Sequence, residues 1–223
     1  MNALEYICNR YGLDRYQKNL PIEIPDTTRD TLASIFADLG FTEGAEIGVE
    51  RGLYSEVLCK NNPGLHLYSI DAWKAYRGYR DHVTQAKLDE IYRDAVLRLA
   101  PYNCTLIRKF SLDAVRTFAD ASLDFVFIDA NHEIRQVIDD ISEWQKKVRV
   151  GGIVAGHDYI LRKGAGYIMH VPYAVRAWTE AYQIGPWFVL GRKNAPEGEV
   201  RETTRSWFYV KGEPVRIKLG HGS

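Results

Sequence analysis

The sequence predicts an α/β protein with a doubly wound, Rossmann-like and mostly parallel seven-stranded sheet that ends in an antiparallel C-terminal hairpin. Two observations lead to this prediction. Short apolar runs alternate with stretches of helical periodicity along most of the chain. Two later apolar runs, 186–191 and 206–210, are separated by a polar loop that contains Pro196 and Gly198, as expected for a hairpin.

The elements expected before the hairpin follow in order. A first helix is expected where Leu32, Ile35, Phe36 and Leu39 share one face, and Gly40 ends it. Five strands are then expected at 45–49, 65–71, 104–110, 123–129 and 151–158. Helices are expected after them at 54–60, 88–99, 112–119, 134–144 and 171–182. The almost continuously apolar run 123–129, LDFVFID, suits the centre of a parallel sheet.

A single domain accounts for most of the chain. The 223 residues, 46% of them hydrophobic, are enough for one α/β domain with a sizeable core. Residues 27–210 are expected to form this domain, with an N-terminal extension at 1–26 and a C-terminal tail at 211–223.

Composition restricts the partners and the compartment. Lys plus Arg and Asp plus Glu are 29 each, so the formal net charge is zero, which argues against broad binding to nucleic acid or to an anionic membrane. Cys8, Cys59 and Cys104 lie far apart with no C-x-x-C spacing, which favours a reducing compartment over a disulfide framework. With neither a secretory signal nor an apolar run of about 18 residues in the sequence, we expect a soluble, cytoplasmic protein.

The stretch EIGVERGLYS, residues 46–55, carries two glycines in the turn after the first expected strand. Gly48 and Gly52 allow a tight turn and let a ligand approach the backbone. Asp71 follows Gly52 by 19 residues at the end of the next strand, where a carboxylate can accept both hydroxyls of a ribose. Glu50 would repel a pyrophosphate, so a nucleoside cofactor with a cationic tail fits better than a dinucleotide.

Three segments resemble class I S-adenosylmethionine-dependent methyltransferases. They are AEIGVERGLYSEVL, LYSIDAW and DFVFIDANHEIRQVIDDISEWQKKVRVGGIVAGHDY. The chain is most similar to the group of catechol O-methyltransferase-like and macrocin O-methyltransferase-type enzymes, over about residues 28–190. The resemblance implies S-adenosylmethionine as the cofactor.

The resemblance also implies the cofactor contacts, residue by residue. They fall on Glu46, Gly48 and Gly52 for the methionine part, Asp71 for the ribose, Ala72, Trp73 and Ser111 for the adenine, and Asp129 for the methyl group. An ordinary helix N-cap is the alternative role for Ser111.

Acid–base groups follow two strands that are expected to be neighbours, in DANH (129–132) and GHDY (156–159). A divalent ion, Mg or Mn, could be held by Asp129, Asp158 and His157 and would acidify a bound hydroxyl. Alternatively, His132 or His157 could take the hydroxyl proton directly. Some related metal-dependent enzymes carry a lysine where this chain has His132, and such enzymes carry an acidic pair or Asp-Asn where it has His157 and Asp158, so both chemistries stay open. The catalytic candidates are Asp129, His132 and His157.

The acceptor is less defined. The segment 73–82 mixes aromatic and basic side chains that could stack on a flat or anionic acceptor, and 161–170 has the composition of a mobile loop. The leading expectation is O-methylation of a small hydroxylated molecule. Methylation of an amine or of an RNA nucleotide, and a non-catalytic nucleoside-binding module, remain as alternatives, and a homodimer is possible.

Overall fold

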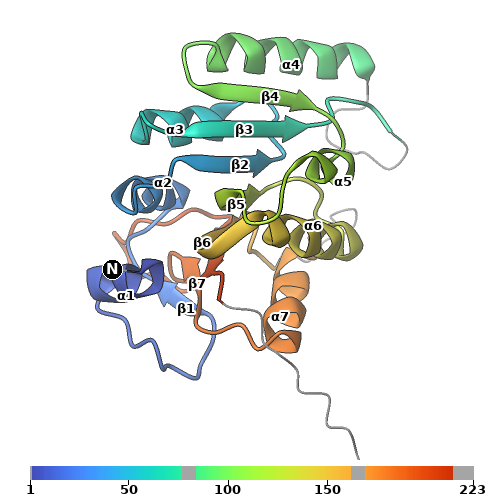
Figure 1. The fold of residues 1–223 in the computed structure, drawn as a ribbon. Helices are drawn as coiled ribbons and strands as arrows, with labels where there is room; N and C mark the ends of the chain where they lie inside the picture. The colour runs from blue at the N-terminus through green and yellow to red at the C-terminus, as the bar shows by residue number, and fades with distance from the viewer. Residues whose placement is uncertain (1, 77–83, 162–168, 213–223) are drawn as a thin grey trace, which may run out of the picture.

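The computed structural model describes residues 2–76, 84–161 and 169–212. These residues form one eight-stranded sheet in the order β1-β7-β8-β6-β5-β2-β3-β4 (Figure 1). The strands are β1 (Ile22–Ile24), β2 (Glu43–Ile47), β3 (His66–Asp71), β4 (Cys104–Arg108), β5 (Leu123–Ile128), β6 (Val148–Gly156), β7 (Trp187–Leu190) and β8 (Trp207–Val210). The helices are α1 (Ala3–Tyr11), α2 (Arg29–Asp38), α3 (Leu53–Asn61), α4 (Gln85–Leu99), α5 (Ser111–Ala114), α6 (Ile134–Lys147) and α7 (Val171–Ala181).

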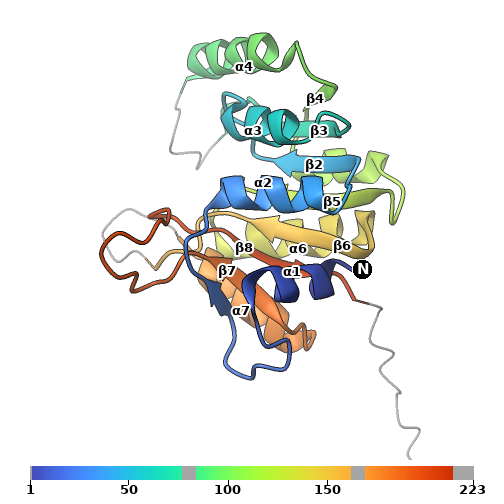
Figure 2. The same cartoon turned by 90° about the vertical axis from the view of Figure 1, so that its left-hand side faces the viewer.

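Helices cover both faces of the sheet, as the doubly wound prediction requires (Figures 1 and 2). Helices α1, α2 and α3 bury one apolar cluster with Phe125 and Phe127, and α5, α6 and α7 bury another with Val126 and Ile128. Strand β5 therefore has apolar side chains on both faces, which explains its nearly continuous apolar sequence. Helix α4 packs on α3 at the β4 end of the sheet.

The expected C-terminal hairpin is confirmed. Strands β7 and β8 pair antiparallel, with Trp187 opposite Tyr209. Strand β8 also pairs antiparallel with β6, so it lies between β6 and β7. The remaining neighbours, from β6 to β4, are parallel, so the carboxyl ends of β2, β3, β5 and β6 lie at one edge of the sheet.

The sheet has one strand more than the seven predicted. Strand β1 lies within residues 1–26 and pairs parallel with β7, with Ile22 opposite Phe188. Its three residues, IEI between Pro21 and Pro25, are too short to show a strand pattern in the sequence. The same segment supplies α1, which buries Ile7, so the predicted extension contributes to the core.

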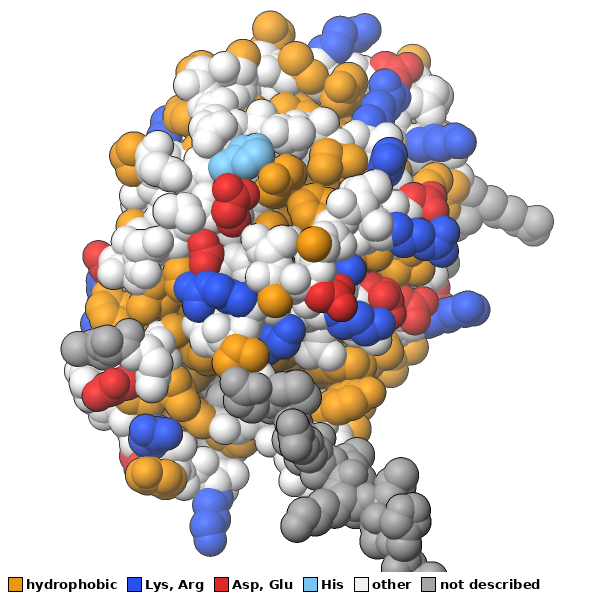
Figure 3. Space-filling view, in the orientation of Figure 1, with side chains coloured by type: hydrophobic (Ala, Val, Ile, Leu, Met, Phe, Trp, Pro, Cys, Tyr) orange, Lys and Arg blue, Asp and Glu red, His pale blue; other side chains and the backbone are white. Residues whose placement is uncertain are grey.

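The outer surface fits the neutral composition. Basic and acidic side chains are interspersed on the face shown in Figure 3. Within the described residues, no helix is long and apolar enough to cross a membrane.

Candidate active site

Both glycines of the first turn lie close to other parts of the protein. Gly48 has φ +90°, and a Cβ on it would come within 2.1 Å of the carbonyl oxygen of Asp129. Gly52 has φ +75°, is the N-cap of α3 and lies against Leu99 of α4. The turn therefore needs glycine for left-handed backbone and for close packing, and contact with a ligand stays a prediction.

Glu46 is buried inside the sheet beside the turn. The side chain is 2% exposed and accepts a hydrogen bond from Ser55, whose hydroxyl lies 2.7 Å from that of Ser69. Burial raises the pKa of Glu46 well above its usual range. The carboxyl group thus lies beneath the turn, and its predicted contact with the methionine part of a cofactor remains a prediction.

Asp71 ties the turn to the end of β3. Its Oδ2 accepts hydrogen bonds from the backbone N–H groups of Val49 and Glu50, both at 3.0 Å, and its Oδ1 accepts from the N–H of Trp73 at 2.9 Å. Asp71, which is predicted to bind the ribose, therefore also fixes the shape of the turn.

Trp73 is buried under α4, and its predicted place beside an adenine stays a prediction. Its φ is +39°, and the indole ring is 1% exposed, packed with Val49, Ile91 and Leu99. Its Nε1 donates to the carbonyl oxygen of Glu50 at 2.8 Å. The ring supports the turn from the α4 side, whereas the neighbouring Ala72 is half-buried.

Ser111 is the first residue of α5, and Phe110 is its N-cap, so the alternative capping role is wrong. The hydroxyl donates to Asp140 and accepts from Trp144 Nε1 at 2.8 Å, both on α6. Burial raises the pKa of Asp140 to about 6. Ser111 therefore joins α5 to α6, and an adenine contact remains a prediction.

We expect Asp140→Asn to stabilise the protein at pH 8 but not at pH 4. Between the usual aspartate pKa of about 4 and the folded value of about 6, the folded state binds more protons, so its stability falls as pH rises. The asparagine lacks this penalty, which is on the order of 2–3 kcal/mol above pH 6. Its amide oxygen can still accept from Ser111.

Calorimetric melting temperatures from pH 4 to pH 8 check this expectation. Asp139→Asn is the control, because Asp139 neighbours Asp140 but its side chain is 44% exposed. Equal pH slopes in wild type and Asp140→Asn would contradict a buried, protonated Asp140.

Three predicted side chains meet where β5 and β6 end. Asp129, His132 and Asp158 form a group whose ligand-type atoms all lie within 4.8 Å of one another. His132 Nε2 is 2.8 Å from Asp158 Oδ2 and 3.8 Å from Asp129 Oδ1. Asp158 adopts left-handed backbone, with φ +55°, at this point. Strained residues of this kind concentrate at functional sites.

The charge state of His132 bears on the choice of base. Burial alone would lower its pKa, but Asp129 and Asp158 outweigh that effect and raise it to about 10. An imidazole with this pKa carries its proton at neutral pH and cannot accept another. In the ion-free protein His132 is therefore a cation that holds two carboxylates together, which disfavours the direct-base alternative.

His157 occupies a deeper position than predicted. It is 8% exposed, and its Nδ1 lies 3.7 Å from both Asp129 Oδ2 and Asp158 Oδ1. Burial lowers its pKa, but the neighbouring carboxylates, Glu202 first, raise it above the usual value. In the described residues, the group of mutually close ligand-type atoms thus contains His132 in place of the expected His157. The roles of His157 as a metal ligand or as the base stay predictions.

Two charged residues near this group were not predicted. Arg29 Nη1 lies 4.0 Å from Asp129 Oδ2, and Glu202 Oε2 lies 3.8 Å from His157 Nε2. Neither residue belongs to a recognisable motif. Arg29 lies at the start of α2, and Glu202 lies in the loop between β7 and β8.

The expected acceptor segments lie partly outside the described residues. This applies to 77–82 and to 162–168. In the described part, the Tyr76 ring meets Phe110 edge-on at 5.7 Å, and its hydroxyl accepts from Asn131 Nδ2 at 3.2 Å. Tyr76 and Phe110 are about 40% exposed and give this edge an accessible aromatic surface.

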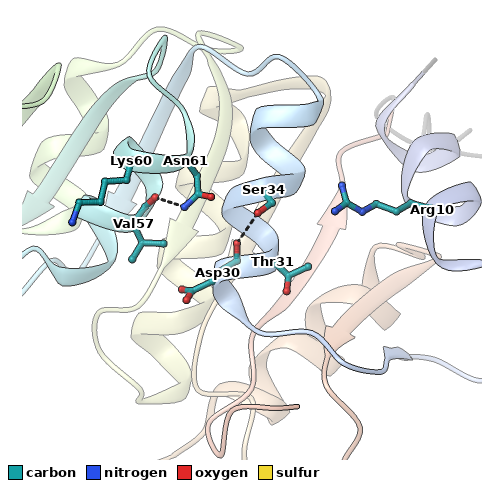
Figure 4. Close-up of a pocket in the computed structure, with 7 residues that line it drawn as sticks. All are labelled: Arg10, Asp30, Thr31, Ser34, Val57, Lys60 and Asn61. Carbon is teal, nitrogen blue, oxygen red and sulfur yellow. Dashed lines mark hydrogen bonds between the residues drawn. The ribbon is translucent and has the colours of Figure 1, made fainter. Parts of the chain in front are cut away.

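A hollow lies away from this edge, between residues of α1, α2 and α3. Figure 4 shows its lining side chains, which come from α1, α2 and α3: Arg10, Asp30, Thr31, Ser34, Val57, Lys60 and Asn61. Its volume is about 540 Å³, but its lining contains none of the predicted site residues.

Comparison with known families identifies the kind of domain that carries this site. A family model described as a methyltransferase domain matches residues 45–159, which is just over half of the chain. The chain belongs to this methyltransferase family. The matched segment runs from Ala45 in β2 to Tyr159, so it contains the glycine turn and the group formed by Asp129, His132 and Asp158, whereas Arg29 and Glu202 lie outside it. The chain is therefore a methyltransferase, of the S-adenosylmethionine-dependent type.

Solved structures agree with this fold. An O-methyltransferase from Bacillus cereus in complex with SAH is 17% identical, with 94% of this chain and 90% of that chain covered and a TM-score of 0.56. The N-methyltransferase NodS from Bradyrhizobium japonicum is 13% identical, with 83% and 95% covered and a TM-score of 0.54. No curated protein matches the sequence. Identities this low establish the fold and leave the acceptor atom undetermined.

Proposed function

We propose that this methyltransferase transfers the methyl group of S-adenosylmethionine to a hydroxyl oxygen of a small molecule, with a divalent cation at Asp129, His132 and Asp158. The supporting observation is the convergence of these three side chains beside the Gly48 turn, at the carboxyl edge of the sheet. Ligands of doubly wound sheets bind at this edge.

The residues fit such an ion. The two carboxylates suit Mg²⁺ or Mn²⁺, and the added imidazole suits Mn²⁺ better than Mg²⁺. Among the described residues, buried His132 Nε2 has no hydrogen-bond partner of good geometry, although Asp158 Oδ2 lies 2.8 Å from it. A divalent cation there would lower the pKa of the acceptor hydroxyl. Loss of the proton from His132 would then make Nε2 a ligand atom.

The protein must also align the acceptor with the methyl donor. The acceptor oxygen must approach the methyl group in line with its bond to sulfur, and the hydroxyl proton must leave. Gly48, in the turn after β2, lies against the backbone carbonyl group of Asp129 at the end of β5. This contact keeps the turn that is expected to bind the cofactor next to Asp129. The methyl donor and the acceptor are thereby expected to meet beside Asp129.

We expect the purified protein to methylate hydroxylated metabolites and to lose this activity on chelation. The assay is mass spectrometry of the protein with S-adenosylmethionine and a panel of phenols, sugars and amines. EDTA should suppress the product, and Mg²⁺ or Mn²⁺ should restore it, because the protonated His132 cannot act as the base. Turnover that is insensitive to EDTA would exclude the ion, and methylated amines as the sole products would exclude the oxygen acceptor.

A further inference from the structure

The two oxygens of the Asp129 carboxylate have different neighbours. Oδ1 faces the proposed metal group, at 3.8 Å from His132 Nε2. Oδ2 lies near two basic groups outside it, at 3.7 Å from His157 Nδ1 and 4.0 Å from Arg29 Nη1. One oxygen is thus oriented toward the site by basic groups that lie around the other.

Glu202 contacts both of these basic groups. Its Oε2 accepts a hydrogen bond from the backbone N–H of Arg29 at 2.9 Å, and its Oε1 lies 3.1 Å from Arg29 Nε. The same Oε2 lies 3.8 Å from His157 Nε2. One oxygen of Glu202 thus holds the backbone of Arg29 while the other holds its guanidinium group, which restrains the position of the side chain at both ends.

Neighbouring parts of the fold hold both Arg29 and Glu202 in place. Arg29 is the first residue of α2, and Tyr54 donates to its carbonyl oxygen at 2.8 Å while lying 5.2 Å from its guanidinium group. The β7–β8 loop carries Glu202 to the start of α2 (Figure 2). An ion pair between Arg205 and Glu23 fixes this loop to β1. The added strand therefore helps to place Glu202.

We propose that Arg29, His157 and Glu202 are positioning residues that hold the Asp129 carboxylate in the orientation the site needs, with Glu202 as the residue that restrains the other two. This role rests on the methyl transfer proposed above. The side chains of Arg29, Asp129 and Glu202 are 33%, 21% and 24% exposed, so water screens their interactions less than those of a surface pair. Without the Glu202 charge, Arg29 would be free to close on Asp129 and draw it away from His132 and Asp158.

The test compares Glu202→Gln with Glu199→Gln. Glutamine keeps an acceptor for the Arg29 N–H but removes the charge. Glu199 is a matched control, because it lies in the same loop and pairs with Arg192 at 3.3 Å. Binding of Mn²⁺ alone is measured by electron paramagnetic resonance, and binding of S-adenosylhomocysteine by calorimetry. We expect Glu202→Gln to weaken Mn²⁺ binding about 10-fold with nearly unchanged S-adenosylhomocysteine affinity, and the control to match wild type.

Crystal structures of wild type and Glu202→Gln without metal provide a second readout. The Arg29 guanidinium group is expected to move into hydrogen-bond distance of Asp129 in the variant. Unchanged positions of Arg29 and Asp129, or wild-type Mn²⁺ affinity in Glu202→Gln, would overturn the positioning role. If wild type itself bound no Mn²⁺, the metal in the proposed function would fail, and the crystal structures would still decide the positioning role.

Discussion

Replacing Asp129 by asparagine is expected to lower the rate of methyl transfer by roughly 10³-fold while the protein stays folded. Asp129 follows β5, and its backbone N–H, which donates to Ile47 at 2.7 Å, is unaffected by the substitution. The side chain is only partly buried and faces His132 and His157 instead of the apolar core. An asparagine of the same shape cannot supply the charge that these groups and a divalent ion require.

The rate is measured by mass spectrometry on the acceptor found with the panel, and folding by the melting temperature. Asp139→Asn serves as the control, since Asp139 is exposed on α6 and contacts only Arg135 at 3.8 Å among the ion pairs of the described residues. We expect Asp129→Asn to shift the melting temperature by less than about 4 °C, equivalent to about 1 kcal/mol. A full rate in this variant would exclude Asp129 from the reaction. A collapse of the melting temperature would make the residue structural.

The central strands of the sheet could be predicted from the sequence because a strand that is buried on both faces is a short, nearly continuous apolar run. The run LDFVFID at 123–129 is apolar on both faces, and the structure places it as β5 between two apolar clusters. Strand β1 could not be predicted, since its three residues become a strand only by pairing with β7, far along the chain.

The edge of the sheet that carries the site was also predictable, whereas the choice of the histidine that lies between Asp129 and Asp158 was not. Strand ends bring Asp129 and Asp158 to one edge whatever their side-chain directions. The choice between His132 and His157 depends on those directions, which are set by packing. Trp73 shows the same limit, because its left-handed backbone and the packing of its ring against α4 depend on the tertiary structure.

Arg29 and Glu202 lay beyond any sequence argument. They are 173 residues apart in the chain and meet only because α2 and the β7–β8 loop are neighbours in the folded protein. Neither residue has a motif or a periodic pattern around it. Long-range contacts of this kind require the tertiary structure.

The largest loss of stability is expected from Gly48→Ala. Alanine would have to adopt φ +90°, which costs about 1–2 kcal/mol, and its Cβ would lie 2.1 Å from the Asp129 carbonyl oxygen and 2.7 Å from the α-carbon of Ala130. Both neighbours are backbone atoms at the end of a central strand, so they cannot move aside as a side chain could. We expect a total loss of about 3 kcal/mol or more in the free energy of unfolding.

Gly198→Ala separates the two contributions. Gly198 has a similar φ, +85°, but a Cβ on it would meet no atom within 4 Å, so this control carries only the backbone cost. Denaturant unfolding of both variants gives the difference, which measures the clash with β5. Because any relief of the clash must displace Asp129, a folded Gly48→Ala protein should also lose Mn²⁺ binding, whereas Gly198→Ala should keep it. Equal losses of stability in the two variants would show that Gly48 serves only the left-handed turn and that contact with Asp129 does not restrict it.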